Sequence, residues 1–187
     1  MIKAIIFDFH DTVIKNGLTP IVKRVKVLSP GIWQPCWRGE TSEKRFWQQW
    51  AKELGRDTKW EENTRQEYYL RSIPVRGILT LVKKLRPDYK LGLLGNCPKA
   101  FFKDAISRFS LNKYFDIMIC SGETGLMKPD PGIYLLICQK LGVMPKECLY
   151  IDDDKIKLQG AKDLGMKGIL FKMTPQLAVE LKNEKYL

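Results

Sequence analysis

Five short apolar runs recur along this chain, and helical patterns separate most of them. The runs lie at residues 2–7, 90–94, 115–119, 148–151 and 168–171. Each is nearly continuous in apolar side chains, which is typical of strands buried on both faces of a parallel sheet. Such strands keep no polar face for water, so we expect other elements to cover both sides of the sheet.

Apolar residues between these runs follow the spacing of one helix face. Four segments show this pattern, at residues 75–86, 99–109, 131–141 and 156–164. Glycine follows the last apolar residue of two of them, as is common where a helix ends. The repeated alternation of strand and helix predicts an α/β fold built on a doubly wound parallel sheet.

Residues 15–73 interrupt this alternation. Helical spacing within the segment predicts an insertion of helices after the first strand. We therefore expect a core domain of residues 1–14 and 74–187, with the insertion at 15–73. Its aromatic residues either form a small core against the main domain or include one or two that face a substrate. The segment holds every tryptophan of the chain: Trp33, Trp37, Trp47, Trp50 and Trp60.

The composition and charge indicate which classes of binding partner to expect. The chain has 187 residues, enough for one core domain with an insertion. Its net charge of +11 comes from lysines and arginines spread along the whole sequence, and no known nucleic-acid-binding motif is present. We therefore expect a generally basic surface without a specific nucleic-acid site. The sequence indicates no particular oligomeric state.

Several absences predict a cytoplasmic location. No apolar run approaches the roughly 20 residues that a membrane helix needs, so we expect no membrane partner. The first residues lack the features of an export signal. The five cysteines form neither a C-x-x-C pair nor a cluster with histidine, which favours reduced thiols.

The residues that follow the predicted strands carry polar and charged groups. Asp8 ends the first run, Gly95 and Asn96 follow the second, Lys128 lies in the loop after the third, and Asp152–Asp154 follow the fourth. In open α/β sheets, ligands bind beyond the carboxyl ends of the strands. We therefore expect these sequence-distant groups to converge at one edge of the sheet.

Carboxylates brought together at that edge repel one another strongly in a medium of low dielectric constant. A hard cation such as Mg²⁺ would remove this repulsion, and Lys128 adds a positive charge. A phosphoryl group would then meet a metal ion, a lysine and loop N–H donors, while Asp8 is suited to attack as a nucleophile. The alternative is that the aspartates cap the next helix and that Lys128 is a solvated loop charge.

Several motifs resemble those of one enzyme family. They read IIFDFHDTV around Asp8, LGLLGNC at residues 91–97, GLMKPDPGIY around Lys128, and YIDDD at residues 150–154, followed by GAKDLGM at 160–166. Together they resemble the haloacid dehalogenase-like (HAD) hydrolases, in the subgroup with a small helical cap after strand one. The resemblance covers nearly the whole chain.

This resemblance implies a Rossmann-like fold, a Mg²⁺ cofactor and hydrolysis of a small phosphorylated metabolite. The reaction would proceed through an aspartyl-phosphate intermediate on Asp8, with Lys128 balancing the charge of the nucleophile and the phosphoryl group. The metal ligands would be Asp8, Asp152, Asp153 and the main-chain carbonyl of His10.

The sequence departs from the family pattern at three positions. His10 stands where these phosphatases usually carry a second aspartate as general acid and base, so it either protonates the leaving group or fills space against the cap. Gly95 stands where a serine or threonine usually binds the phosphoryl oxygen, which leaves main-chain N–H groups with Asn96 and Lys128 for that contact. Asp11 replaces a small glycine, and we expect its side chain to point away from the reaction.

Three functions therefore remain open. The first is a Mg²⁺-dependent phosphatase that uses Asp8, His10 and Lys128 in catalysis. The second is a catalytically silent protein of the same fold that binds a metal, an anion or a protein partner, which the changes at His10 and Gly95 favour. The third is dehalogenase or phosphonatase-like chemistry on the same scaffold.

Overall fold

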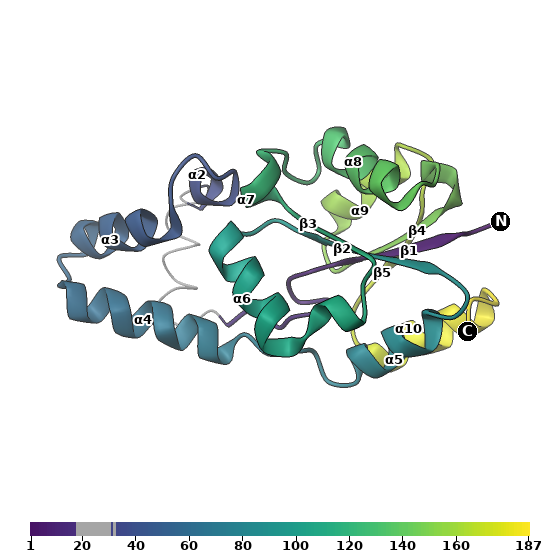
Figure 1. The fold of residues 1–187 in the computed structure, drawn as a ribbon, viewed down its shortest axis with the longest axis horizontal. Helices are drawn as coiled ribbons and strands as arrows, with labels where there is room; N and C mark the ends of the chain where they lie inside the picture. Colours follow the sequence, from purple (N-terminus) through teal and green to yellow (C-terminus); the bar gives the residue numbers. More distant parts are fainter. Residues whose placement is uncertain (18–30, 32) are drawn as a thin grey trace.

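The computed structural model describes residues 1–17, 31 and 33–187 (Figure 1). In chain order the described elements are β1 (Ala4–Asp8), α2 (Gln34–Trp37), α3 (Glu43–Glu53), α4 (Thr58–Arg71), α5 (Ile78–Leu85), β2 (Lys90–Gly95), α6 (Lys99–Phe109), η1 (Leu111–Lys113), β3 (Ile117–Cys120), α7 (Ser121–Thr124), α8 (Pro131–Leu141), η2 (Pro145–Glu147), β4 (Cys148–Asp152), α9 (Lys155–Lys162), β5 (Lys167–Leu170) and α10 (Thr174–Asn183).

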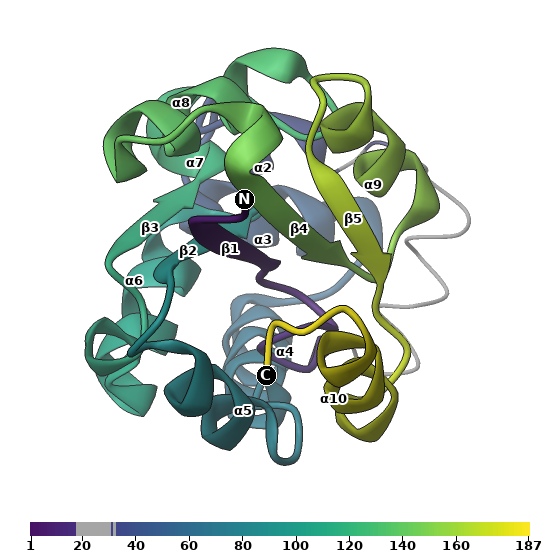
Figure 2. The same cartoon turned by 90° about the vertical axis from the view of Figure 1, so that its right-hand side faces the viewer.

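The described strands form one parallel sheet in the order β3-β2-β1-β4-β5 (Figure 2). Each strand overlaps the apolar run that predicted it, so the predicted α/β, Rossmann-like fold is confirmed. The chain begins in the central strand, moves outward to β3 and then crosses to β4 and β5. The strand order thus reverses between β1 and β4, which is where such sheets bind their ligands.

Helices cover both faces of the sheet, as Figure 2 shows. Side chains alternate along each strand, so Ile5 and Phe7 pack toward α5, α6 and α10, while Ala4 and Ile6 pack toward α8 and α9. Four of these helices overlap the four segments predicted from helical spacing. The fifth, α10, lies in a segment to which the sequence analysis assigned no element.

Helices α2, α3 and α4 lie beyond the carboxyl ends of the strands, at the left of Figure 1. Trp33, Trp47 and Trp50 are buried there, and they belong to the same apolar cluster as Phe9 and Phe101 next to the sheet. This burial supports packing as the use of these three aromatic side chains. Part of the predicted insertion, at 18–30 and 32, lies outside the described residues.

Helix α9 approaches the loop before α8 very closely. A Cβ atom added at Gly160 would lie 2.9 Å from both the carbonyl oxygen and the Cβ of Pro129. Only glycine permits this approach without displacement of one segment, because the obstacle includes backbone. The contact holds α9 against the residue that directly follows Lys128.

None of the helices in the described residues combines the length and the apolarity needed to span a bilayer.

Replacement of Trp47 by alanine tests how much the aromatic packing stabilises the fold. Trp47 is fully buried, and its Nε1 donates a hydrogen bond to Glu43 Oε1 at 3.2 Å. We expect Trp47→Ala to lower the free energy of unfolding by about 3–5 kcal/mol, because it removes a large buried ring and leaves a cavity. Urea unfolding followed by circular dichroism measures this loss.

The matched control is Leu70→Ala on α4, where the side chain is exposed. This change should alter the unfolding free energy by about 0.5 kcal/mol or less. Equal effects of the two substitutions would contradict a packed core around Trp47.

Candidate active site

The register of the sheet brings Asp8 and Asp152 side by side. Strands β1 and β4 pair in parallel with Phe7 opposite Ile151, so the next residue of each strand is an aspartate. Both aspartates are buried. Because side chains alternate along strands, their carboxylates share the face on which Tyr150 also lies. The predicted convergence of the first and fourth strand ends is therefore present.

Lys128 supplies the positive charge that these carboxylates need. Its side chain is completely buried, and its ammonium contacts the Asp8 carboxylate. The same Nζ lies 3.1 Å from Asp152 Oδ2, 2.8 Å from the Tyr150 hydroxyl and 3.0 Å from the Leu94 carbonyl oxygen. A buried charge is tolerated when it is paired and hydrogen-bonded, as here. The interpretation of Lys128 as a solvated loop charge is therefore wrong.

Asn96 holds the backbone of Lys128 in place. Its side-chain Nδ2 donates to the Lys128 carbonyl at 2.8 Å, and its Oδ1 accepts from the Lys128 N–H at 2.9 Å. These two bonds use the amide group of Asn96 within the protein. The predicted contribution of Asn96 to anion binding therefore rests on its main-chain N–H.

The carboxylates form a cluster suited to a cation. Asp8, Asp152 and Asp153 each offer an oxygen atom, and these atoms lie within 4.8 Å of one another. Asp8 Oδ2 is buried without a hydrogen-bond partner among the described residues. An unpaired carboxylate oxygen in a buried site favours a bound cation, and a set of hard oxygen ligands fits Mg²⁺.

The electrostatics of the cluster agree with this fit. Burial raises the pKa of Asp8, Asp152 raises it further, and Lys128 acts in the opposite direction. Asp153 is exposed at the edge of the cluster, and partial burial of its carboxyl, together with the charge of Asp152, raises its pKa. Burial would raise the pKa of Asp152 too, but Lys128 and Lys157 outweigh it, so this pKa lies below its usual value. The cluster thus holds negative charge that the two lysines balance only in part.

His10 lies between the sheet domain and the helices beyond it. Its Nε2 is 3.3 Å from the hydroxyl of Tyr68 on α4. Its ring stacks on Phe101 of α6, with centroids 5.4 Å apart and planes 19° apart. The side chain is half-buried, two residues after Asp8. This position fits either of its predicted uses, proton donation or contact with the cap.

Asp11 adopts an unusual backbone conformation. Its φ of 57° lies in the left-handed region, which favours the glycine that the family pattern carries at this position. Its Oδ1 accepts a hydrogen bond from the Asn16 N–H at 2.9 Å, and the residue is exposed. The carboxylate of Asp11 therefore serves its own loop.

The surroundings of Gly95 are tight for the serine or threonine that the family pattern would place there. A Cβ added at Gly95 would lie 3.0 Å from Cys97 Sγ and 3.1 Å from Phe9 Cβ. Cβ atoms seldom approach neighbours this closely, so a larger residue would require Phe9 or Cys97 to move. The absence of a serine or threonine at position 95 is thus related to the large side chain of Phe9, which follows Asp8.

Two residues of the site were not identified from the sequence. The hydroxyl of Tyr150 donates to Asp152 Oδ2 at 2.6 Å and contacts Lys128. The sequence did contain a signal for Tyr150. It lies two residues before Asp152 on the same strand, and residues two apart on a strand point to the same face of the sheet. Lys157, in the first turn of α9, is the second.

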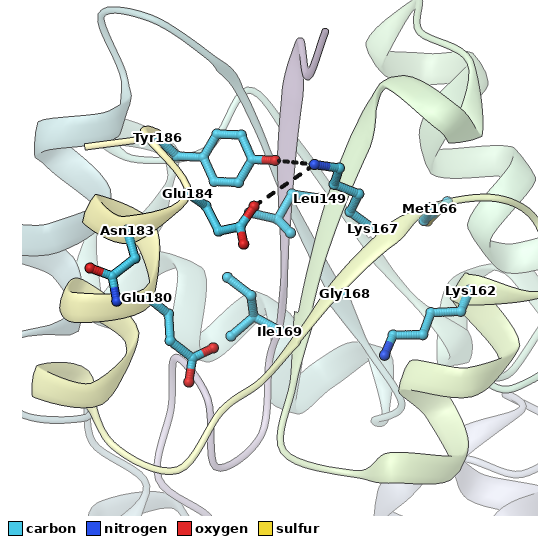
Figure 3. A pocket seen from close by; sticks show the side chains of 10 residues that line it. All are labelled: Leu149, Lys162, Met166, Lys167, Gly168, Ile169, Glu180, Asn183, Glu184 and Tyr186. Atoms are coloured by element: carbon cyan, nitrogen blue, oxygen red, sulfur yellow. Dashed lines mark hydrogen bonds and ion pairs between the residues drawn. The ribbon is translucent and has the colours of Figure 1, made fainter.

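A separate hollow lies between β5 and α10 and encloses about 660 Å³ (Figure 3). Figure 3 shows Lys167 directed toward Tyr186 and Glu184, at 3.0 and 3.9 Å. Its lining includes none of the aspartates of the cluster, so it is distinct from the candidate site.

Several curated proteins of similar sequence are named phosphatases. The chain is 30% identical over 188 residues to D-ribitol-5-phosphate phosphatase of Bacteroides thetaiotaomicron, covering 89% of this chain and 90% of that protein. It is 27% identical over 191 residues to flavin mononucleotide hydrolase 1 of Arabidopsis thaliana, covering 95% and 75%. It is 36% identical over 95 residues to a phosphorylated carbohydrates phosphatase of Thermotoga maritima, covering 51% and 43%, so this match spans less than half of that relative.

Solved structures show the same fold. A HAD family enzyme of Bacteroides thetaiotaomicron, in complex with magnesium and inorganic phosphate, aligns with a TM-score of 0.77 at 22% identity, covering 92% of this chain and 96% of that one. L-2-haloacid dehalogenase of Xanthobacter autotrophicus aligns with a TM-score of 0.67 at 24% identity, covering 99% and 83%.

A family model extends this agreement to most of the chain. The model for haloacid dehalogenase-like hydrolases matches residues 2–165, which include every residue of the candidate site. On this match, and on the shared fold and strand-end carboxylates, the chain belongs to the haloacid dehalogenase-like hydrolases.

Proposed function

We propose that this hydrolase is a Mg²⁺-dependent phosphatase that acts on a small phosphorylated metabolite through an aspartyl-phosphate intermediate on Asp8. The observation that carries the proposal is the buried Asp8 carboxylate, held by Lys128 through Oδ1 while Oδ2 has no partner in the described structure. A buried oxygen without a partner needs either a cation or an incoming group to interact with. The relatives named for phosphorylated carbohydrates and D-ribitol 5-phosphate support the substrate class.

The metal site would use the side chains of Asp8, Asp152 and Asp153 with the main-chain carbonyl of His10. A bound Mg²⁺ would supply positive charge for a phosphoryl group at this edge of the sheet. The crystallised HAD family enzyme that contains magnesium and inorganic phosphate has the same fold, which supports this choice of ion.

The residues of the site would carry out the transfer and the hydrolysis of the phosphoryl group. An Asp8 oxygen forms a bond to phosphorus while the bond from phosphorus to the leaving oxygen breaks, and the leaving oxygen takes a proton from solvent water. Water then attacks phosphorus, releases inorganic phosphate and restores the Asp8 carboxylate. Lys128 orients Asp8 and balances the negative charge that gathers in both steps. Main-chain N–H groups at Gly95 and Asn96 would bind the phosphoryl oxygens.

Two roles can be proposed for His10. As a general acid, its imidazole would protonate the leaving oxygen. As a packing residue, it would join α4 to α6 through Tyr68 and Phe101, the contacts that it makes in this structure. We propose that packing is the main role of His10, because its ring contacts two large aromatic side chains, Tyr68 and Phe101.

The helices beyond the strand ends would act as a cap. We propose that residues 15–73 form this unit and that 1–14 with 74–187 form the core domain. Contacts join the two parts at several places, such as Arg108 Nη1 to the Tyr69 carbonyl oxygen at 2.7 Å and Arg38 Nη1 to the Gly125 carbonyl oxygen at 3.4 Å. Substrate choice would then depend on the side chains that α4 and its neighbours present to the core.

A cytoplasmic location is part of the proposal. All five cysteines are free and buried thiols, which supports a reducing compartment.

One observation favours a second candidate, a catalytically silent member of the family. The crowded Gly95 and the histidine at position 10 remove two side chains that the family phosphatases use. The buried Asp8, Lys128 and Asp152 weigh against it, because a scaffold alone gains nothing from adjacent buried carboxylates.

Phosphate release under matched conditions separates these candidates. An aryl phosphate and a panel of sugar and nucleotide phosphates are assayed with Mg²⁺ and with EDTA, for the original chain and for Asp8→Asn. We expect turnover that needs Mg²⁺ and that falls about 10³-fold or more in Asp8→Asn, because the nucleophile is removed. Absence of turnover across the panel would favour the silent candidate, and halide release from a 2-haloacid without metal would favour dehalogenase chemistry.

Replacement of His10 tests its role. We expect His10→Asp to raise the phosphatase rate about tenfold, because a carboxyl group would stand where the general acid of the family stands. His10→Ala is the matched control and should lower the rate only slightly if packing dominates. A steep fall in both variants would instead identify the imidazole as the working acid, and the pH profile of kcat/KM would then lose one limb in His10→Ala.

A further inference from the structure

A second lysine belongs to the acidic end of the site. Lys157 lies in the first turn of α9, which begins directly after Asp152–Asp154. Its Nζ is 3.5 Å from Asp154 Oδ2, and its side chain is about three-quarters buried, with 24% exposed. This position keeps the ammonium among the carboxylates and away from most solvent.

The backbone around Lys157 is fixed from two sides. Asp154 Oδ1 accepts hydrogen bonds from the Ile156 N–H at 2.8 Å and from the Lys157 N–H at 3.4 Å, so Asp154 caps the helix. The hydroxyl of Tyr134 donates to the Lys157 carbonyl oxygen at 2.7 Å, and the Tyr134 ring packs edge-on against Tyr150. The start of the side chain is thereby held close to the carboxylate cluster.

The charge of Lys157 acts on every carboxylate of this cluster. Burial alone would lower the pKa of Lys157, but Asp8, Asp152, Asp154 and Asp153 together raise it to about 12. Reciprocally, Lys157 acts to lower the pKa of Asp8, Asp152 and Asp153, against the burial that acts to raise each of them. The oxygens of these three residues lie within 4.8 Å of one another.

The two lysines have different surroundings. Lys128 is fully enclosed and bound directly to Asp8 and Asp152, so it cannot leave without exposing buried charge. Lys157 is partly exposed and contacts Asp154, which is not one of the three clustered carboxylates. Lys157 therefore neighbours the cluster through Asp154, the residue after Asp153, and keeps some contact with solvent.

We propose that Lys157 is an internal counter-cation that weakens the binding of divalent metal at the Asp8, Asp152 and Asp153 cluster. The inference rests on the proposed metal site and concerns how tightly that site binds. Like charges at short range repel, so a fixed ammonium beside the cluster opposes a second cation. The same ammonium stabilises the metal-free protein, because it offsets part of the repulsion between the carboxylates.

Direct measurement of metal binding tests this inference without reference to turnover. Mn²⁺ serves as the probe, and its dissociation constant is measured by electron paramagnetic resonance of the free ion, with Mg²⁺ in competition. We expect Lys157→Met to bind Mn²⁺ roughly tenfold more tightly than the original chain, and Lys157→Arg to bind within about threefold of it. Lys162→Met, an exposed lysine of the same helix, is the control for net charge and should change little.

Thermal unfolding provides a second readout. Without metal, Lys157→Met should have a lower Tm than the original chain, and Mg²⁺ should raise the Tm of this variant more than that of the original. This pattern also shows that the variant folds.

Asp153→Asn separates the two proposals. If the original chain binds Mn²⁺, Asp153→Asn loses it, and Lys157→Met binds no more tightly, then the inference about Lys157 is wrong and the metal site stands. If no variant binds metal, the proposed metal site and this inference are both wrong.

Discussion

The contact of Lys128 with Asp8 and Asp152 is the interaction on which the rest of the site depends. Two carboxylates end neighbouring strands on the same face of the sheet, and both are buried. Without a cation between them they would repel one another in a medium that screens charge poorly. Removal of one partner from such a buried group typically costs about 3–5 kcal/mol, since the remaining charge is left unpaired. The lysine thus stabilises the fold of the strand ends, independently of the catalytic role proposed for it.

The surrounding residues keep this lysine in one place. Asn96, directly after β2, forms hydrogen bonds with the backbone of Lys128, and the hydroxyl of Tyr150 on β4 accepts one from its ammonium. The site therefore draws on β1, β2, β4 and the loop before α8. The central strand β1 pairs with both β2 and β4, because the strand order reverses there. The doubly wound topology thus brings together groups from different strand ends, and these groups pair with Lys128.

Sequence patterns predicted the sheet, four of the five helices that cover it, and the convergence of Asp8, Lys128 and Asp152. These features follow from local periodicity and from the rule that parallel strands end at one edge. The pairing of the Asn96 amide with Lys128 could not be predicted, because it depends on the path of a loop. The crowding at Gly95 likewise depends on where Phe9 packs.

Other features escaped prediction because their signal is weak. Helix α10 buries only Leu177 and Leu181, and two apolar positions four residues apart are too few to predict a helix. The placement of Lys157 among carboxylates requires knowledge of where the first turn of α9 points. In each case the decisive information is a contact between segments that are distant in sequence or a direction set by packing.

The close approach of Gly160 to Pro129 has a consequence for motion. Because the two backbones touch with no intervening side chain, α9 and the segment that carries Lys128 behave as one rigid piece. A rearrangement that withdrew Lys128 from Asp8 would have to carry the acidic strand end and α9 along with it. Movement of the helices beyond the strand ends would leave this contact intact, because none of them contributes to the approach of Gly160 to Pro129.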